Sequence, residues 1–235
     1  AAVGSSASLI FLLVGFFNGL AMGAGVIIAR HYGAKDFEAL KQVTHTVVAF
    51  GLIVGAFLTV LGVVTTPIIL RWMDTPAEVL PQSIDYFRYY FLGAIFTVMY
   101  NIFVGILHAV GDSKHPLYYL IFSTCVNIAL DMLFVAVLGW GVGSAAIATT
   151  ISQGVSALLC LIHILRVDEP YRVSIRKIRF HKESLVEIVR YGLPSGVQNS
   201  VIALANVVVQ TNINSFGKAA MAGCGSYSKL EGFAF

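Results

Sequence analysis

The sequence predicts an all-α fold, a polytopic bundle of membrane-spanning helices, from its composition and the spacing of its apolar runs. The 235 residues are 57% hydrophobic and 11% charged, and the mean hydropathy is +0.82. Soluble domains carry roughly 25% charged residues, so this composition favours an integral membrane protein. Runs long enough to cross a hydrocarbon core of about 30 Å recur along the chain, without sustained alternation of the kind seen in barrel strands.

Six apolar runs and the start of a seventh are predicted to be helices. The short connection at Gly139, Trp140 and Gly141 makes the runs beside it antiparallel neighbours. Pro194, near the start of the last complete run, is expected to kink or loosen that helix because proline removes a backbone hydrogen bond. The chain begins without Met and stops inside an apolar stretch, so we expect a longer protein. The runs cover about residues 4–29, 43–70, 86–110, 116–138, 141–165 and 185–214, and the last starts near residue 219.

Basic residues gather in alternate loops. Loops 30–42, 111–115 and 166–183 hold ten Lys and Arg residues in total. The positive-inside rule therefore makes these three loops cytoplasmic. The third is the longest and is interrupted by Glu169-Pro170, so we predict that it separates two helical bundles. Residues 175–189 could form a short amphipathic helix on the membrane surface or a solvated basic loop.

Asp131 lies in the middle of an apolar run, four residues after Asn127. A charged group at this depth costs a few kcal/mol on insertion scales and usually marks a functional site. The four-residue offset places the amide and the carboxylate on one helix face. They offer oxygens to a small cation, and the carboxylate can also accept a proton. This pattern predicts a transporter with a cation site, although a carboxylate that only bonds a neighbouring helix is the alternative.

Thr149 lies on the next run at about the depth of Asp131, because each is eight or nine residues from the connecting turn. Its hydroxyl, with the carbonyl of Ala145 one turn earlier, could complete a site for Na⁺ at Asp131, Asn127 and Thr149. The alternative is a threonine that bonds only its own helix backbone.

Amides without acids mark other runs. Asn199, Asn206 and Gln210 lie on one stripe of the run 185–214, and single amides at mid-membrane depth are Asn18 and Asn101. A polar stripe on a membrane helix faces protein or water rather than lipid. We predict that these residues line a substrate cavity, with hydrogen bonding between helices as the alternative.

Other classes of protein are disfavoured. HExxH, GxSxG and glycine-rich phosphate loops with Lys are absent from the sequence, which argues against an enzyme. Basic residues punctuate apolar runs instead of clustering as in nucleic-acid-binding proteins. Three cysteines without a CxxC pair argue against a disulfide framework or a zinc site.

Five segments together resemble the multidrug and toxic compound extrusion (MATE) family, and they cover essentially the whole chain in order. The resemblance implies two lobes of six plus six helices, of which this chain holds part. Residues 1–165 would be the second to sixth helices, 166–183 the cytoplasmic linker, and 184–235 the seventh helix and part of the eighth. The segments are NGLAMGAGVIIARHYGAKD, HAVGDSKHP, NIALD, GSAAIATTIS and YGLPSGVQN.

The resemblance also implies an activity. In this family a gradient of Na⁺ or H⁺ drives export of organic, often cationic, compounds. Asn127, Asp131, Thr149 and the Ala145 carbonyl match its cation site. We therefore expect an antiporter that is monomeric when full length, with a small organic substrate, the lipid bilayer as its surroundings and no cofactor beyond the coupling ion.

Two departures from the family bear on this expectation. An acid that the family places on its first helix would precede Ala1, and the second-lobe acid of one branch has no counterpart. The second departure favours coupling through the first lobe. A flippase for lipid-linked precursors, of related architecture, is the alternative; it would favour a cationic cavity, and intramembrane Arg and Lys are few.

Overall fold

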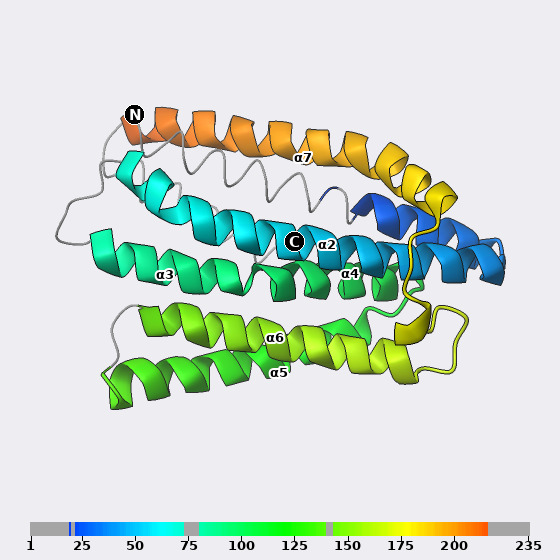
Figure 1. Ribbon diagram of the computed structural model, residues 1–235, viewed down its shortest axis with the longest axis horizontal. Helices are drawn as coiled ribbons and strands as arrows, with labels where there is room; N and C mark the ends of the chain where they lie inside the picture. Colours follow the sequence, from blue (N-terminus) through cyan, green and yellow to red (C-terminus); the bar gives the residue numbers. More distant parts are fainter. Residues whose placement is uncertain (1–18, 20–21, 73–79, 140–142, 216–235) are drawn as a thin grey trace.

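The structure, a computed structural model, describes residues 19, 22–72, 80–139 and 143–215. These residues form long helices that run side by side (Figure 1), and no strand occurs among them, which confirms the all-α prediction. Four helical segments in the described part are long and apolar enough to cross a membrane. They are Phe37–Ile68, Ile84–Ala109, Lys114–Val135 and Ser144–Arg166.

The helices follow the predicted order. The predicted run 4–29 lies mostly outside the described residues, and the run near 219 lies wholly outside them. α7 continues through Pro194 as one helix, so the proline does not end it. The helices are residues 22–33, α2 (Phe37–Trp72), α3 (Leu80–Leu92), α4 (Ala94–Ala109), α5 (Lys114–Asp131) with the π-helix Met132–Val137, α6 (Gly143–Arg166) and α7 (Lys182–Ser215).

The run predicted as one helix over 86–110 begins at Leu80 and is divided at Gly93. The N–H of Gly93 donates to the Tyr90 carbonyl, three residues back, at 3.0 Å. The Tyr89 carbonyl, four residues back, accepts a hydrogen bond from Thr150 Oγ1 of α6 at 3.0 Å. A hydroxyl of a neighbouring helix thus takes the carbonyl that a continuous helix would use. The division depends on tertiary packing, which the apolar pattern does not encode.

We expect Gly93→Ala to lower the melting temperature of the full-length protein in detergent. A Cβ at Gly93 would lie 2.6 Å from Thr150 Oγ1 and 3.0 Å from its Cγ2, and overpacking of this kind costs about 1–3 kcal/mol. Gly154→Ala is the control, because its Cβ would lie 3.7 Å or more from the nearest side chain, Phe96. Equal melting temperatures for the two variants would contradict the close contact at Gly93.

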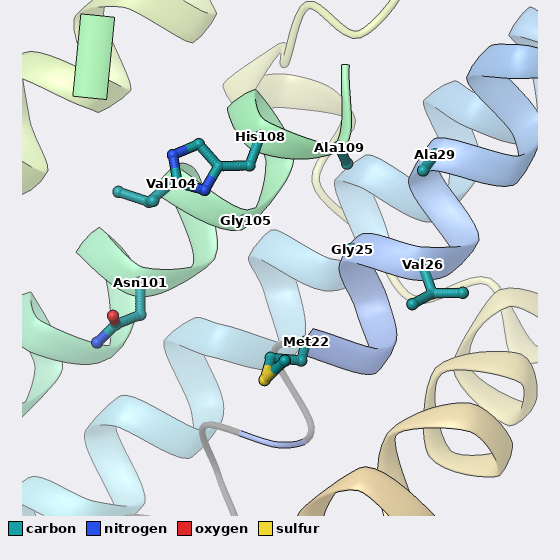
Figure 2. A pocket seen from close by; sticks show the side chains of 9 residues that line it. All are labelled: Met22, Gly25, Val26, Ala29, Asn101, Val104, Gly105, His108 and Ala109. Carbon is teal, nitrogen blue, oxygen red and sulfur yellow. The ribbon is translucent and has the colours of Figure 1, made fainter. Parts of the chain in front are cut away.

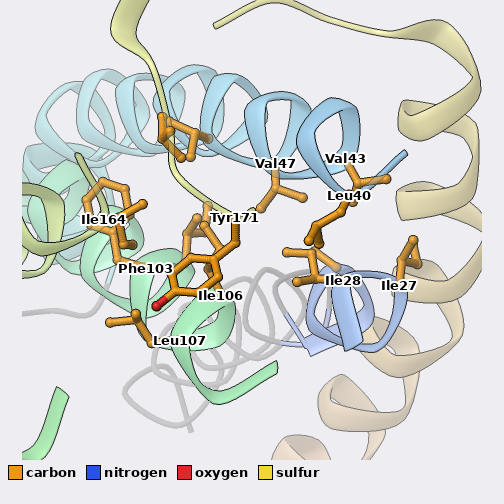
Figure 3. Close-up of a cluster of buried hydrophobic side chains, with 14 of the residues drawn as sticks. Ile27, Ile28, Leu40, Val43, Val47, Phe103, Ile106, Leu107, Ile164 and Tyr171 are labelled. Atoms are coloured by element: carbon orange, nitrogen blue, oxygen red, sulfur yellow. The ribbon is translucent and has the colours of Figure 1, made fainter. Parts of the chain in front are cut away.

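The buried core lies toward the end of the bundle where the three basic loops meet (Figures 1 and 3). Leu40, Ile106 and Ile164 come from three helices and are 0% exposed. Tyr171 of the loop between α6 and α7 joins this core and packs edge-on against Tyr32, with ring centroids 6.4 Å apart. Burial raises the pKa of Tyr171 to about 12, so its hydroxyl stays neutral. The three basic loops lie at one end of the bundle, in agreement with the prediction that they lie on the same side of the membrane.

The connection from α6 to α7 is mostly irregular. Ile175–Lys177 form a single 3₁₀ turn, and α7 begins only at Lys182. A continuous amphipathic helix over 175–189 is therefore wrong, and the loop interpretation is nearer to the structure. The connection returns to α6, since the N–H of Val173 donates to the Ile164 carbonyl at 3.3 Å.

α2 holds the same connection through two side chains that the sequence had not singled out as anchors. His45 Nε2 accepts a hydrogen bond from the Ser174 N–H at 3.0 Å, while its Nδ1 lies 2.6 Å from the Lys41 carbonyl. Thr46 Oγ1 accepts from the His181 N–H at 3.2 Å. The start of α7 is thereby tethered to α2.

Candidate functional site

Asp131 is the last residue of α5, and Asn127 lies one turn earlier. The Oδ1 atom of Asp131 and the Nδ2 atom of Asn127 are buried and have no hydrogen-bond partner among the described residues. A buried polar group without a partner costs about 1–3 kcal/mol, and more when it is charged. Such groups call for a ligand, an ion or a functional explanation.

The helix changes type directly after Asp131. Met132–Val137 form a π-helix, in which Leu138 N–H donates five residues back to the Leu133 carbonyl at 2.9 Å. π-turns are rare and frequently occur at functional sites. Asp131 therefore lies where the backbone hydrogen bonds change from the α to the π pattern.

α6 packs beside α5 and runs in the opposite direction (Figure 1). Thr149 Oγ1 donates to the Ala145 carbonyl at 2.9 Å, which is the backbone bond given as the alternative role for this threonine. The hydroxyl oxygen keeps lone pairs that can accept a proton donor or contact a cation. Whether Thr149 and Ala145 contribute to a cation site therefore stays a prediction.

Gln153 is a residue that the sequence reasoning missed. Its Oε1 atom is buried and without a hydrogen-bond partner in the described part of the chain. Gln153 follows Thr149 by one turn, and its count from the α5–α6 turn, about thirteen residues, matches that of Asn127 at the same depth. The offset of four from Thr149 was the available signal.

Counted from the α5–α6 turn, these groups are expected to form two polar levels on neighbouring helices, Asp131 with Thr149 and Asn127 with Gln153. Carboxylate, amide, hydroxyl and carbonyl oxygens are the ligands that hard cations prefer. The orphaned Asp131 and Gln153 oxygens fit a cation or a proton. The amide of Asn127 can present its oxygen after a flip, because nitrogen and oxygen are assigned from the hydrogen-bond network.

The helix ending at residue 33 meets α7 through glycines. A Cβ at Gly23 would overlap the backbone of Gly192, and a Cβ at Gly19 would overlap the backbone of Gly196. On each helix the two glycines are four residues apart, which is the spacing of small residues that lets membrane helices approach closely. This crossing joins the two segments predicted to belong to different lobes.

An ion pair lies at the basic-loop end of the same crossing. Arg30 Nη2 is 2.8 Å from Glu187 Oε1, and His31 Nε2 is 3.6 Å from Glu187 Oε2. The Arg30 and Glu187 side chains are 46% and 37% exposed, and pairs of this kind contribute about 0–1 kcal/mol. The ion pair therefore adds little to the stability of this crossing.

A cavity of about 560 Å³ lies between the 22–33 helix and α4 (Figure 2). Its wall is mainly apolar, and Asn101 and His108 supply its polar side chains. Asn101 is exposed, and its Nδ2 donates to the Thr97 carbonyl at 2.9 Å. The lining residues are Met22, Gly25, Val26, Ala29, Asn101, Val104, Gly105, His108 and Ala109.

Two other residues predicted for a substrate cavity lie on α7. Asn199 is next to the cavity wall, because its Nδ2 lies 3.8 Å from the sulfur of Met22, and Asn206 is exposed. Asn18 lies outside the described residues, as does the side chain of Gln210.

The comparisons with known proteins agree with this architecture. The family described as MatE matches residues 1–133. A probable multidrug resistance protein of Bacillus subtilis strain 168, YoeA, is 33% identical over 99% of this chain. The chain belongs to the MatE family. It spans about half the length of the curated relatives it matches, 52% in the case of YoeA.

Solved structures of MATE transporters extend the similarity to three dimensions. The outward-facing conformation of a multidrug resistance MATE family transporter gives a TM-score of 0.81 at 28% identity, over 97% of this chain and 50% of that chain. The inward-facing conformation of such a transporter gives 0.76 at 28% identity, over 89% and 48%. The fold of this chain is thus similar to both of these solved conformations.

Membership in the MatE family confirms two further predictions. Members are multi-pass membrane proteins, in agreement with the four apolar spans in the described part of the chain. They are transporters rather than enzymes, so the intramembrane-enzyme alternative falls away. The division into lobes and linker stays a prediction.

Proposed function

We propose that the full-length MatE protein is an antiporter in which entry of Na⁺ or H⁺ drives export of organic, cationic compounds by alternating access. The observation that carries the proposal is the buried Asp131 carboxylate, whose Oδ1 has no partner among the described residues. A carboxylate left in this state inside a span is costly unless a cation or a proton joins it. Binding of a cation or a proton to Asp131 is therefore favourable, and its free energy can drive substrate export.

Asp131 would hold the coupling cation, with Asn127 and Gln153 supplying amide oxygens and Thr149 a hydroxyl. A coupling ion shifts a conformational equilibrium only by its differential affinity for the two states. The π-turn after Asp131 supports such a difference, because its register can change when the carboxylate is neutralised.

The glycine crossing supports alternating access. It brings the backbones of the 22–33 helix and α7 into direct contact at Gly23 and Gly192. Glycines cost no side-chain entropy when they pack, so such a contact can form and open within a few kcal/mol. The cavity beside the crossing offers an apolar wall with Asn101 for an organic substrate.

The experiment is a transport assay with the full-length protein in vesicles, using a cationic dye under an imposed Na⁺ or pH gradient. We expect dye movement opposite to one of the two gradients and none in its absence. Dye movement that ignores both gradients would overturn the coupling. The described cavity wall carries no Lys or Arg, so no observation favours the flippase alternative.

A further inference from the structure

A second polar cluster lies at the basic-loop end of the bundle, away from Asp131. It consists of Asp112 in the α4–α5 loop, His115 in the first turn of α5 and His163 in the last turn of α6. One ligand atom of each residue lies within 4.8 Å of the others. Asp112 Oδ2 is 2.7 Å from His115 Nδ1 and 3.4 Å from His163 Nε2.

The Asp112 carboxylate is held in place by its other oxygen. Asp112 Oδ1 accepts a hydrogen bond from the His115 backbone N–H at 3.2 Å, which caps the start of α5. This bond leaves Oδ2 directed at the two imidazoles. Burial alone would raise the pKa of Asp112, but the hydrogen bonds of His115 and the charges of both histidines outweigh it and lower the pKa. The carboxylate is therefore ionised at neutral pH.

His163 is oriented by a contact at its other ring nitrogen. Its Nδ1 lies 3.2 Å from the Tyr119 hydroxyl, so Nδ1–H can donate to Tyr119 and leave the Nε2 lone pair facing Asp112. Histidines that bind metals almost always have the second ring nitrogen engaged in this way, because the bond fixes the tautomer. The His115 and His163 rings lie with centroids 4.3 Å apart and an interplanar angle of 35°.

The spacing suits a tetrahedral ion. Bonds of about 2.0–2.1 Å place tetrahedral ligand atoms roughly 3.3 Å apart. The separation between Asp112 and His163 already has this value, and the shorter one to His115 needs a small outward movement. The His115 side chain is 49% exposed, so it has room to move. Two imidazoles and a carboxylate favour Zn²⁺ or a similar transition metal over Mg²⁺ or Ca²⁺.

We propose that Asp112, His115 and His163 bind one divalent transition-metal ion of the Zn²⁺ class, with water as the fourth ligand. The ion joins the start of α5 to the end of α6, beside the point where Val173 of the connecting loop bonds Ile164. It would thereby stabilise the end of α6, where the connection to α7 begins. The cysteine count could not reveal this site, because none of its ligands is a cysteine.

The test is a Zn²⁺ titration of the full-length protein, freed of its purification tag and stripped with a chelator. We expect one ion per chain with a Kd of about 10 μM or lower. Co²⁺ in place of Zn²⁺ should give the visible absorption of a four-coordinate site. Failure of the protein to bind either ion would overturn the proposal without touching the transport mechanism, which uses Asp131.

His115→Ala and Asp112→Asn should each weaken Zn²⁺ binding at least about tenfold. Because His115 is half exposed, its replacement should leave the fold and the metal-free melting temperature unchanged. Tyr119→Phe should weaken binding by about tenfold while both imidazoles remain, as expected of a positioning residue.

Two histidine variants serve as controls. His108→Ala removes an exposed imidazole of α4 outside the cluster, and His31→Ala removes the imidazole that lies 3.8 Å from Asp36 and 3.6 Å from Glu187. Both should bind Zn²⁺ with unchanged affinity. Binding that is lost in His31→Ala and kept in His115→Ala would place the ion elsewhere and overturn the assignment.

Discussion

Asp131→Asn in the full-length protein is expected to reduce gradient-driven efflux at least about tenfold while expression and membrane insertion are preserved. The variant keeps the size and polarity of the side chain but removes the charge that attracts a cation and the site that takes a proton. Asp131 Oδ1 has no hydrogen-bond partner among the described residues, so the substitution breaks no hydrogen bond at that atom. The measurement is dye efflux from vesicles under imposed Na⁺ and pH gradients.

The matched control is Glu38→Gln, which makes the same chemical change on an acid whose side chain is 84% exposed and pairs with Lys41 at 3.4 Å. Its efflux should equal that of the unaltered protein. Gln153→Leu removes the amide oxygen that Gln153 would supply to the coupling ion. It should lower the apparent affinity for that ion more than it lowers the maximal rate of efflux. Unaltered efflux in Asp131→Asn would remove this carboxylate from the mechanism.

The sequence was sufficient to single out Asp131 as a candidate, because an acid inside an apolar span is rare enough to be informative alone. It did not single out Gln153, whose Oε1 is buried without a described partner, because an isolated amide on a long helix has many structural uses. The π-helix that begins at Met132 contains no proline or glycine from which a change of helix type could be predicted. Its position depends on how α5 packs, and the chain offers no local signal for that.

The helices of the fold were predictable from the sequence, but the details that depend on tertiary contacts were not. The number and order of helices follow from apolar length, which the bilayer thickness imposes. The division at Gly93 was not predictable, because it depends on a hydroxyl from Thr150, over fifty residues away. The contact between His45 and Ser174 was not predictable either, because the two residues are far apart in the sequence and meet only in the folded bundle.

Gly23→Ala is expected to reduce efflux at least about tenfold by preventing the crossing between the 22–33 helix and α7 from closing. The added methyl would overlap the Cα and backbone nitrogen of Gly192, and backbone atoms cannot rotate away as a side chain can. Spin labels at exposed Ala34 and Glu183, in a protein without its native cysteines, should report a longer mean distance than in the parent.

The control for Gly23→Ala is Gly33→Ala, at the end of the same helix and outside the cavity wall. Its Cβ would have no neighbour within 4 Å, so both efflux and label distance should be unchanged. The comparison separates closure from helix propensity, because both variants add the same methyl and both favour the helix. If Gly23→Ala kept the parent distance and full efflux, the glycine crossing would have no part in alternating access, while the role of Asp131 in coupling would stand on its own evidence.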